Sequence, residues 1–452
     1  MKKLTYTYKS IKKNITSSSV AKKVFENSSW QIANSIFKMI LGVFVTGVVA
    51  RYFGPDKFGQ LNYSVAFVSL FTVIANLGLE TLAVKNIVEE SWDEGTILCT
   101  SLILRIIGGS LLTGVAYIII NIIEPNDTNM HILVLIMSFT MILKAFEVIE
   151  YWIQAYQRAK ISSIVRMATY ILVCLLKISI VMFKGNIIVY ALVYSIESAV
   201  FGIAILIAYF KIREKISPWK FSVKYAKYIL SQSWYLILSG LMVSLYNRID
   251  QVMLGSMLTT KTETGIYSAA VTIAEMWYFV PIAVITSFKP VIMLKKKEGE
   301  ESYIKSVQTL YSIIIIISVT FGIFITIFSR LIVSILYGPE FIKSASVLTI
   351  LVWAGTFAML GSSRSIWLIC EGLQRYSMIY TFVGCIANIP LNYILIPKYG
   401  AYGAAVATLV AQFLNIVTLS FFKDTKISTK MIRKSFSPMY MIRNIKQLIN
   451  KE

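Results

Sequence analysis

The sequence predicts an all-α integral membrane protein with about twelve transmembrane helices in two six-helix lobes. Of its 452 residues, 56% are hydrophobic and only 15% are charged, whereas soluble globular domains carry roughly 25% charged residues. The apolar residues come in runs of about 20 or more, the length that crosses a ~30 Å hydrocarbon core. The runs are continuous, without the in/out alternation of a membrane barrel, so we expect the spans to be helices.

The expected helices follow one another along the chain, separated by short polar loops that contain Gly and Pro. Their ranges are 29–51, 60–80, 97–123, 131–153, 161–183, 186–210, 228–256, 265–288, 304–329, 345–370, 376–396 and 401–422. The basic loop 211–227 lies midway and divides the helices into six and six. The predicted parts are therefore a tail at 1–28, a first lobe at 29–210, a linker at 211–227, a second lobe at 228–422 and a tail at 423–452.

The basic residues indicate how the chain is oriented in the membrane. The formal net charge is +21, but no soluble segment is long enough to form a nucleic-acid-binding domain, so we expect no nucleic-acid partner. About 30 of the 44 Lys and Arg residues fall on the side of the two termini and about 7 on the other, and the side rich in Lys and Arg stays in the cytoplasm. We expect a multi-pass protein of the plasma membrane with both termini cytoplasmic.

Several classes of enzyme are excluded by missing motifs. The sequence contains no GxxxxGK[ST] phosphate-binding loop, no HExxH and no GxSxG. Its four cysteines lie inside predicted helices without a CxxC pair, and its single histidine, His131, begins a helix, so we expect no metal site and no cofactor. The expectation is a protein that is not an enzyme.

Ionisable side chains inside the predicted helices are the candidate site residues. Each costs about 2.5–3.5 kcal/mol at the centre of a bilayer, so it usually faces a partner or a water-filled cavity. The predicted substrate-binding cations are Lys38, Lys144, Lys177 and Arg248. The predicted coupling or structural carboxylates are Glu147, Glu197, Asp250 and Glu275.

Spacing along the chain leaves two interpretations for some of these charges. Lys38 lies on a stripe of polar and small residues, which fits either helix packing or the wall of a cavity. Lys144 and Glu147 are three residues apart and can form an ion pair. Lys177 and Glu197, on successive helices, can pair with each other.

The helix expected at 228–256 carries the densest polar cluster, around Arg248 and Asp250. These two residues are two apart, point in different directions and need other partners. Glu275 lies near the middle of its helix and must be paired, solvated or protonated. Arg166 and Arg364 are expected to reach the inner membrane surface with their long side chains. The excess of cations favours an anionic ligand such as a phosphate or diphosphate, which Arg can bind with two hydrogen bonds.

Six short segments, in their order and spacing, carry a resemblance to a known family. They are RYFGPDKFG at 51–59, YWIQA at 151–155, RIDQ at 248–251, GIYSAA at 265–270, LYGPEF at 336–341 and PKYGAYGAA at 397–405. With them the chain resembles the polysaccharide-transporter family of bacteria, the flippases of O-antigen and capsule repeat units. That family belongs to a superfamily with the multidrug and toxin extrusion exporters and the lipid II flippases.

The resemblance implies a flippase of the bacterial inner membrane that works by alternating access. It would move an oligosaccharide repeat unit linked to undecaprenyl diphosphate from the inner to the outer leaflet, for O-antigen, capsule or exopolysaccharide synthesis. It also implies a central cleft between the lobes, with Lys38 and Arg248 in regions where related flippases keep cations. The implied partners are the lipid-linked substrate, membrane lipids, and the polymerase and glycosyltransferases of the same pathway.

Three alternatives stay open on the sequence. A multidrug or cation exporter of the same fold would favour an acidic cleft, against which Lys38 and Arg248 argue. A non-transporting membrane scaffold of a glycan-synthesis complex would tolerate neutral residues at these positions. A membrane glycosyltransferase would need an external catalytic portion, which the short outer loops cannot provide.

Overall fold

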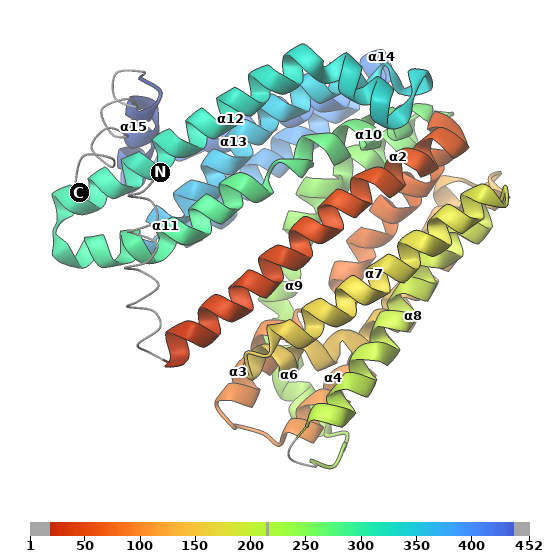
Figure 1. Ribbon diagram of the computed structural model, residues 1–452, viewed down its shortest axis with the longest axis horizontal. Helices are drawn as coiled ribbons and strands as arrows, with labels where there is room; N and C mark the ends of the chain where they lie inside the picture. The colour runs from red at the N-terminus through yellow and green to blue at the C-terminus, as the bar shows by residue number, and fades with distance from the viewer. Residues whose placement is uncertain (1–18, 214–216, 438–452) are drawn as a thin grey trace. The chain divides into compact units, whose positions relative to one another are not determined.

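The computed structural model describes residues 19–213 and 217–437, and every regular element in these ranges is a helix (Figure 1). Ten of the described helical spans are long and apolar enough to cross a membrane. Two elements within them, α2 (Ser19–Ala75) and α14 (Arg375–Thr418), each join two helices across a kink. Ten spans with two internal kinks correspond to about twelve crossings, and the predicted all-α fold is confirmed.

The other helices follow in chain order. The N-terminal half contains α3 (Leu79–Val88), α4 (Glu94–Ile123), α5 (Thr128–Leu143), the 3₁₀-helix η1 (Lys144–Val148), α6 (Ile149–Ala155), α7 (Ala159–Met182) and α8 (Ile187–Ile212). The C-terminal half contains α9 (Val223–Met257), α10 (Thr262–Met276), α11 (Phe279–Glu298), α12 (Glu300–Tyr337), the 3₁₀-helix η2 (Pro339–Phe341), α13 (Ser344–Cys370) and α15 (Lys426–Ser435). Of the predicted tails and linker, residues 1–18, 214–216 and 438–452 lie outside the described ranges.

The two kinks lie in two of the motifs that carry the family resemblance. Gly54 has a φ of 72°, a left-handed conformation that glycine adopts at little cost because it lacks a Cβ. Pro55 follows it and has no amide hydrogen to donate to the preceding turn. Gly400 makes the second kink with a φ of 55°, three residues after Pro397. These residues therefore turn the chain from one membrane span into the next.

Two predicted helices are interrupted. The span expected at 131–153 consists of α5, η1 and α6, and the span expected at 265–288 is divided between α10 and α11. A 3₁₀ segment within a helix often marks a hinge or local strain. Lys144 and Glu147 both lie in η1, so their side chains leave the helix in directions that an uninterrupted α-helix would not give.

The described chain groups into two compact units. The first contains residues up to Gly42 together with Phe71–Ile122 and His131–Leu238, and the second contains Val43–Leu70, Ile123–Met130 and the chain from Ser239 onward. The kink of α2 and the connection after α4 are thus packed within the second unit, although the sequence assigns both segments to the first lobe.

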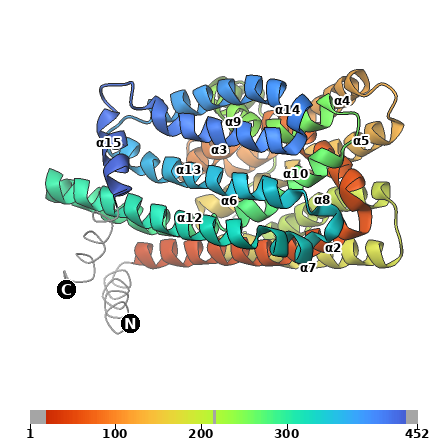
Figure 2. The same ribbon diagram turned by 90° about the horizontal axis from the view of Figure 1, so that it is seen from above.

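Each unit has its own apolar core. In the first unit, α7 packs along α8, and the core includes Leu79, Ile97 and Trp152. In the second unit, α12 and α14 both run beside α13 (Figure 2), around buried Trp277 and Tyr311. These contacts pack the helices of each unit against one another.

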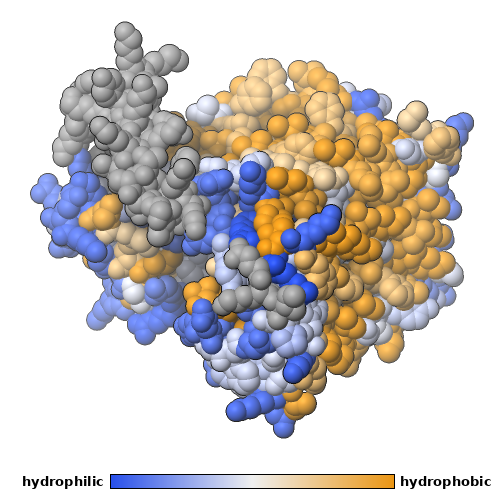
Figure 3. All heavy atoms as spheres, turned by 60° about the horizontal axis from the view of Figure 1, so that its bottom comes forward, coloured by the Kyte–Doolittle hydropathy of each residue, from blue (hydrophilic) through white to orange (hydrophobic). Residues whose placement is uncertain are grey.

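Large apolar side chains also cover the outside of the helices. Figure 3 shows them over a broad part of the face drawn. Exposed examples on spanning helices are Ile122, Met182 and Ile327. Patches of this extent are rare on soluble monomers and mark a surface that contacts another apolar phase, here the lipid chains that the composition predicts.

Candidate functional site

Lys38 is the first predicted substrate cation, and it is half-buried on α2 within the first unit. Its ammonium lies 5.5 Å from the centre of the Tyr170 ring on α7. The carboxylates of Glu147, Glu150 and Glu197 act on it electrostatically, but none of the ion pairs in the described ranges includes Lys38. Among the described residues, Lys38 is therefore near carboxylates but in an ion pair with none of them.

Lys177 has a similar environment on α7. Its ammonium lies 4.5 Å from the centre of the Tyr194 ring and 5.8 Å from that of Tyr190, both on α8. The expected ion pair with Glu197 is not formed in the part of the chain that the structure describes. An aromatic face stabilises a cation without neutralising its charge.

Glu147 has a partner that the sequence did not indicate. Its carboxylate lies 3.7 Å from the guanidinium of Arg105 on α4, rather than in an ion pair with Lys144. Arg105 is 3% exposed and also donates hydrogen bonds to Asn76 (2.6 Å) and Tyr151 (3.2 Å). The geometry favours a structural role for Glu147, since its charge balances a buried arginine. The signal in the sequence was a lone Arg within an apolar helix.

Arg166 was expected to extend toward the inner membrane surface without a partner, and the structure instead pairs it with a carboxylate. On α7 it forms an ion pair with Glu150 that includes a hydrogen bond of 3.0 Å from Nε. Its guanidinium also lies 4.2 Å from the centre of the Phe201 ring. A nearby carboxylate on α6 holds the side chain within the unit, because two opposite charges in lipid are better satisfied by each other than alone.

Arg364 departs from the same expectation in the second unit. It is fully buried on α13 and donates hydrogen bonds to the carbonyl oxygens of Ile416 (3.1 Å) and Asn415 (2.9 Å). These carbonyls lie in the last turn of α14, which leaves four carbonyl groups without an intrahelical partner. Arg364 is therefore bound to a helix end.

Arg248 is the predicted cation of the second unit. It is half-buried on α9, and its Nη1 lies 3.4 Å from Oε1 of Gln251, which is a weak contact. Its charge acts on the exposed carboxylate of Glu275 on α10. The two side chains do not form one of the ion pairs found in the described residues. Like Lys38, Arg248 lacks a neutralising partner at close range.

Asp250 lies two residues after this arginine on α9, in a different environment. It is 4% exposed and accepts hydrogen bonds from Tyr267 (2.7 Å), Thr408 (2.7 Å) and Asn392 (2.5 Å). Oδ1 of Asn392 is buried without a hydrogen-bond partner in this same region. The oxygen-rich surroundings could hold a proton or a small monovalent cation. Nowhere in the described ranges do three His, Cys, Asp or Glu side chains form a metal-binding group.

Lys261 lies between the helices expected at 228–256 and 265–288, where the sequence predicts a loop, but the structure shows its side chain buried. It is 5% exposed, directly before α10, and its ammonium forms an ion pair of 2.6 Å with Glu124. Nothing in the local sequence indicates this pair, because the two residues are far apart along the chain.

Comparison with known proteins identifies the family. A family model described as polysaccharide biosynthesis protein matches residues 24–294, which is more than half of the chain. The chain belongs to this family. The matched segment contains all eight predicted site residues, from Lys38 to Glu275. A second model, described as MatE, matches residues 236–394. The family resemblance found in the sequence is confirmed.

Two proteins of similar sequence each cover more than four fifths of the chain. A probable low-salt glycan biosynthesis flippase of Haloferax volcanii, Agl15, is 25% identical over 391 residues, which make up 84% of the chain and 79% of that protein. The capsular polysaccharide biosynthesis protein CapF of Staphylococcus aureus is 20% identical over 401 residues, covering 88% of the chain and 98% of CapF.

Solved structures show the same fold. A lipid II flippase, MurJ, in an inward closed conformation superposes with a TM-score of 0.73 at 16% identity, over 93% of the chain and 92% of MurJ. An inward-facing multidrug resistance MATE transporter gives 0.61 at 15% identity, over 89% and 96%. This family member is a multi-pass membrane protein with the predicted MATE-like fold. The matches indicate a transporter rather than an enzyme.

Proposed function

We propose that the protein is a flippase that moves a lipid-linked oligosaccharide from the inner to the outer leaflet of the plasma membrane by alternating access. More specifically, we propose that the carrier lipid is undecaprenyl diphosphate. The oligosaccharide would then be used for the synthesis of O-antigen, capsule or exopolysaccharide. Relatives named as a glycan biosynthesis flippase and a capsular polysaccharide biosynthesis protein support a glycan substrate. The lipid II flippase among the structural matches supports a lipid-linked one.

The observation that carries the proposal is the set of cations that have no neutralising partner among the described residues. Lys38 and Lys177 lie beside tyrosine rings, and Arg248 makes only a long contact with a neutral amide. By contrast, Arg105 and Arg166 have carboxylates within ion-pair distance. Unpaired cations inside membrane helices are costly and mark the path of a charged ligand. We therefore assign substrate binding to Lys38, Lys177 and Arg248, with Lys144 as a secondary candidate.

A diphosphate group suits these cations chemically. It carries about two negative charges, and moving it through lipid without partners would cost many kcal/mol. Arg can bind phosphate oxygens with two parallel hydrogen bonds, whereas Lys acts as a point charge. Lys38 in the first unit and Arg248 in the second are therefore each suited to bind the oxygens of a phosphate group.

Asp250 is our choice for the coupling carboxylate. It is buried among three hydrogen-bond donors, and none of the described ion pairs includes it. Uptake of a proton or a monovalent cation there would change the hydrogen bonds that connect α9, α10 and α14. Glu147 already balances Arg105, so a coupling role fits it less well. Glu197 interacts electrostatically with Lys38, and Glu275 with Arg248, so in this proposal these two carboxylates tune the substrate cations.

The direction of transport depends on the proposed topology, with both termini and the 211–227 linker in the cytoplasm. A cysteine at exposed Asn126 should then react with an impermeant maleimide in intact cells, and one at exposed Lys220 should react only after lysis. The basis is the asymmetry of Lys and Arg across the membrane. Labelling of the Lys220 position in intact cells would reverse the topology.

Transport itself is tested in proteoliposomes that contain a fluorescent lipid-diphosphate oligosaccharide. The purified protein should move the labelled lipid between leaflets at least about tenfold faster than it moves in empty vesicles, which corresponds to a barrier lowered by about 1.4 kcal/mol or more. The same vesicles should not accumulate ethidium. Ethidium transport without lipid movement would support the exporter, and neither activity would support the scaffold. In this assay Asp250→Asn should remove any dependence on a proton or Na⁺ gradient, and an unchanged dependence would contradict its coupling role.

A further inference from the structure

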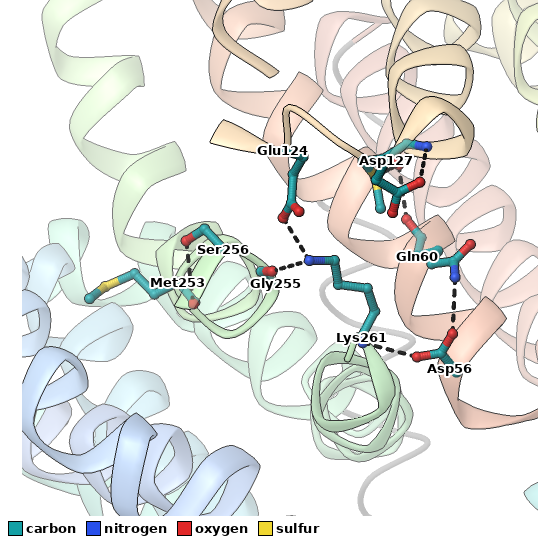
Figure 4. A network of polar contacts seen from close by, with 10 residues as sticks. Asp56, Gln60, Glu124, Asp127, Met253, Gly255, Ser256 and Lys261 are labelled. Atoms are coloured by element: carbon teal, nitrogen blue, oxygen red, sulfur yellow. Dashed lines mark hydrogen bonds and ion pairs between the residues drawn. The ribbon is translucent and has the colours of Figure 1, made fainter. Parts of the chain in front are cut away.

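One end of the second unit is held together by charged side chains bound to helix ends. Lys261 is at its centre (Figure 4). Its Nζ lies 2.6 Å from Oε1 of Glu124 and 2.6 Å from the carbonyl oxygen of Gly255. Gly255 belongs to the last turn of α9, whose final carbonyls have no intrahelical partner. The ammonium therefore satisfies a helix C-terminus and a carboxylate together.

Asp56 makes the opposite contact from the kink of α2. Its Oδ1 accepts a hydrogen bond of 3.0 Å from the backbone amide of Lys261, at the N-terminus of α10. Its Oδ2 accepts one of 2.9 Å from Gln60 (Figure 4). A carboxylate is stabilised at a helix N-terminus by the free amides and the helix dipole.

Arg51 repeats the arrangement at a third helix. Its guanidinium donates to the carbonyl oxygens of Leu336 (3.1 Å) and Ser334 (3.1 Å), and also to that of Ile335. All three belong to the last turn of α12. Arg51 thus binds the C-terminus of α12 and Asp56 the N-terminus of α10. In both cases the side-chain charge is opposite to the partial charge of the helix end.

The backbones also approach closely at this end. A Cβ placed on Gly59 would lie 1.8 Å from the carbonyl oxygen of Lys261, and one placed on Gly265 would lie 2.0 Å from that of Pro55. Neither position can accept a larger residue without separating α2 from α10. Phe58 adds an apolar contact with Phe341, with ring centres 5.8 Å apart.

We propose that Arg51, Asp56, Glu124 and Lys261 form a latch that closes and reopens this end of the second unit during each transport cycle. Water can replace each of their hydrogen bonds when the helix ends separate, so the net free-energy difference per bond is small. Such hydrogen bonds and ion pairs can therefore break and form again within a cycle at a small net cost. The transport role rests on the proposed flippase function, and the orientation proposed above makes this the outer end.

The test measures opening without substrate, so it is independent of the flippase proposal. Thr264 is fully buried in the first turn of α10, and Thr264→Cys places a thiol beneath the latch. In full-length protein whose four native cysteines are replaced by alanine, the reaction of this thiol with a water-soluble maleimide reports opening in nanodiscs.

Lys261→Met and Glu124→Gln should each increase the labelling rate about tenfold, the effect of losing one charge-assisted hydrogen bond. The double variant should label no faster than the faster single variant, because both remove the same pair. Lys57→Met, which changes an exposed cation on the same bend, should leave the rate unchanged.

Glycine variants test the latch independently, through the close packing of α2 against α10. Gly59→Ala should hold the end open and give fast labelling, whereas Gly361→Ala, at a position with open space around the added methyl, should not. Parental labelling rates in both the Lys261 and Gly59 variants would overturn the latch. Fast labelling in these variants together with normal lipid movement would show that the end opens but that closing it is not needed for transport.

Discussion

Replacing Lys38 or Arg248 by alanine is expected to reduce movement of the lipid-linked oligosaccharide at least a hundredfold, with the protein still folded and inserted. Each substitution removes a cation that has no neutralising partner in the described structure, so the fold loses little. The diphosphate loses a charge-assisted contact worth several kcal/mol in a poorly hydrated path. The measurements are flipping in proteoliposomes, surface glycan in cells and protein abundance in the membrane.

Two further variants make this prediction specific. Arg248→Lys should restore only part of the activity, because an ammonium cannot bind a phosphate with two parallel hydrogen bonds. Arg330→Ala changes an exposed arginine on α12 and should leave transport unchanged. If Arg248 only balances Glu275, then Arg248→Ala would lower abundance and Glu275→Ala would restore it. Normal flipping by both single variants at normal abundance would exclude the proposed role.

Replacing Arg105 by alanine is expected to reduce the amount of folded protein, whereas the Lys38 and Arg248 variants lose transport but stay folded. Arg105 is 3% exposed and binds Glu147, Asn76 and Tyr151. Removing one member of a buried ion pair leaves the other charge uncompensated and costs about 3–5 kcal/mol. We expect the lower end of this range, because the Glu147 side chain retains 25% exposure. The measurements are membrane abundance and thermal unfolding in detergent.

The double variant Arg105→Met with Glu147→Gln separates a structural from a coupling role of Glu147. Removing both charges should restore most of the lost stability, since no unpaired charge remains. The restored protein should also flip lipid. If it is stable but inactive, Glu147 takes part in transport and our assignment of a structural role is wrong.

The sequence identified most of the charged residues of the candidate site, but it predicted few of the partners with which they interact. Lys38, Lys177 and Arg248 were recognised as costly charges inside apolar helices, and this depends only on their position in the sequence. Their partners depend on which helix faces which. For this reason Lys177 lies beside Tyr194 instead of pairing with Glu197, and Arg166 pairs with Glu150.

The sequence by itself determined that this chain is an all-α membrane protein with about twelve crossings and cations within them. The length of an apolar run and the presence of Gly54 or Pro55 are local properties, and the backbone responds to them locally. Only the tertiary structure decided which charges are neutralised and that Lys261 is buried against Glu124 and α9. Electrostatic and hydrogen-bond energies fall steeply with distance, so the role of each charge depends on neighbours that the packing of distant segments brings within a few ångströms.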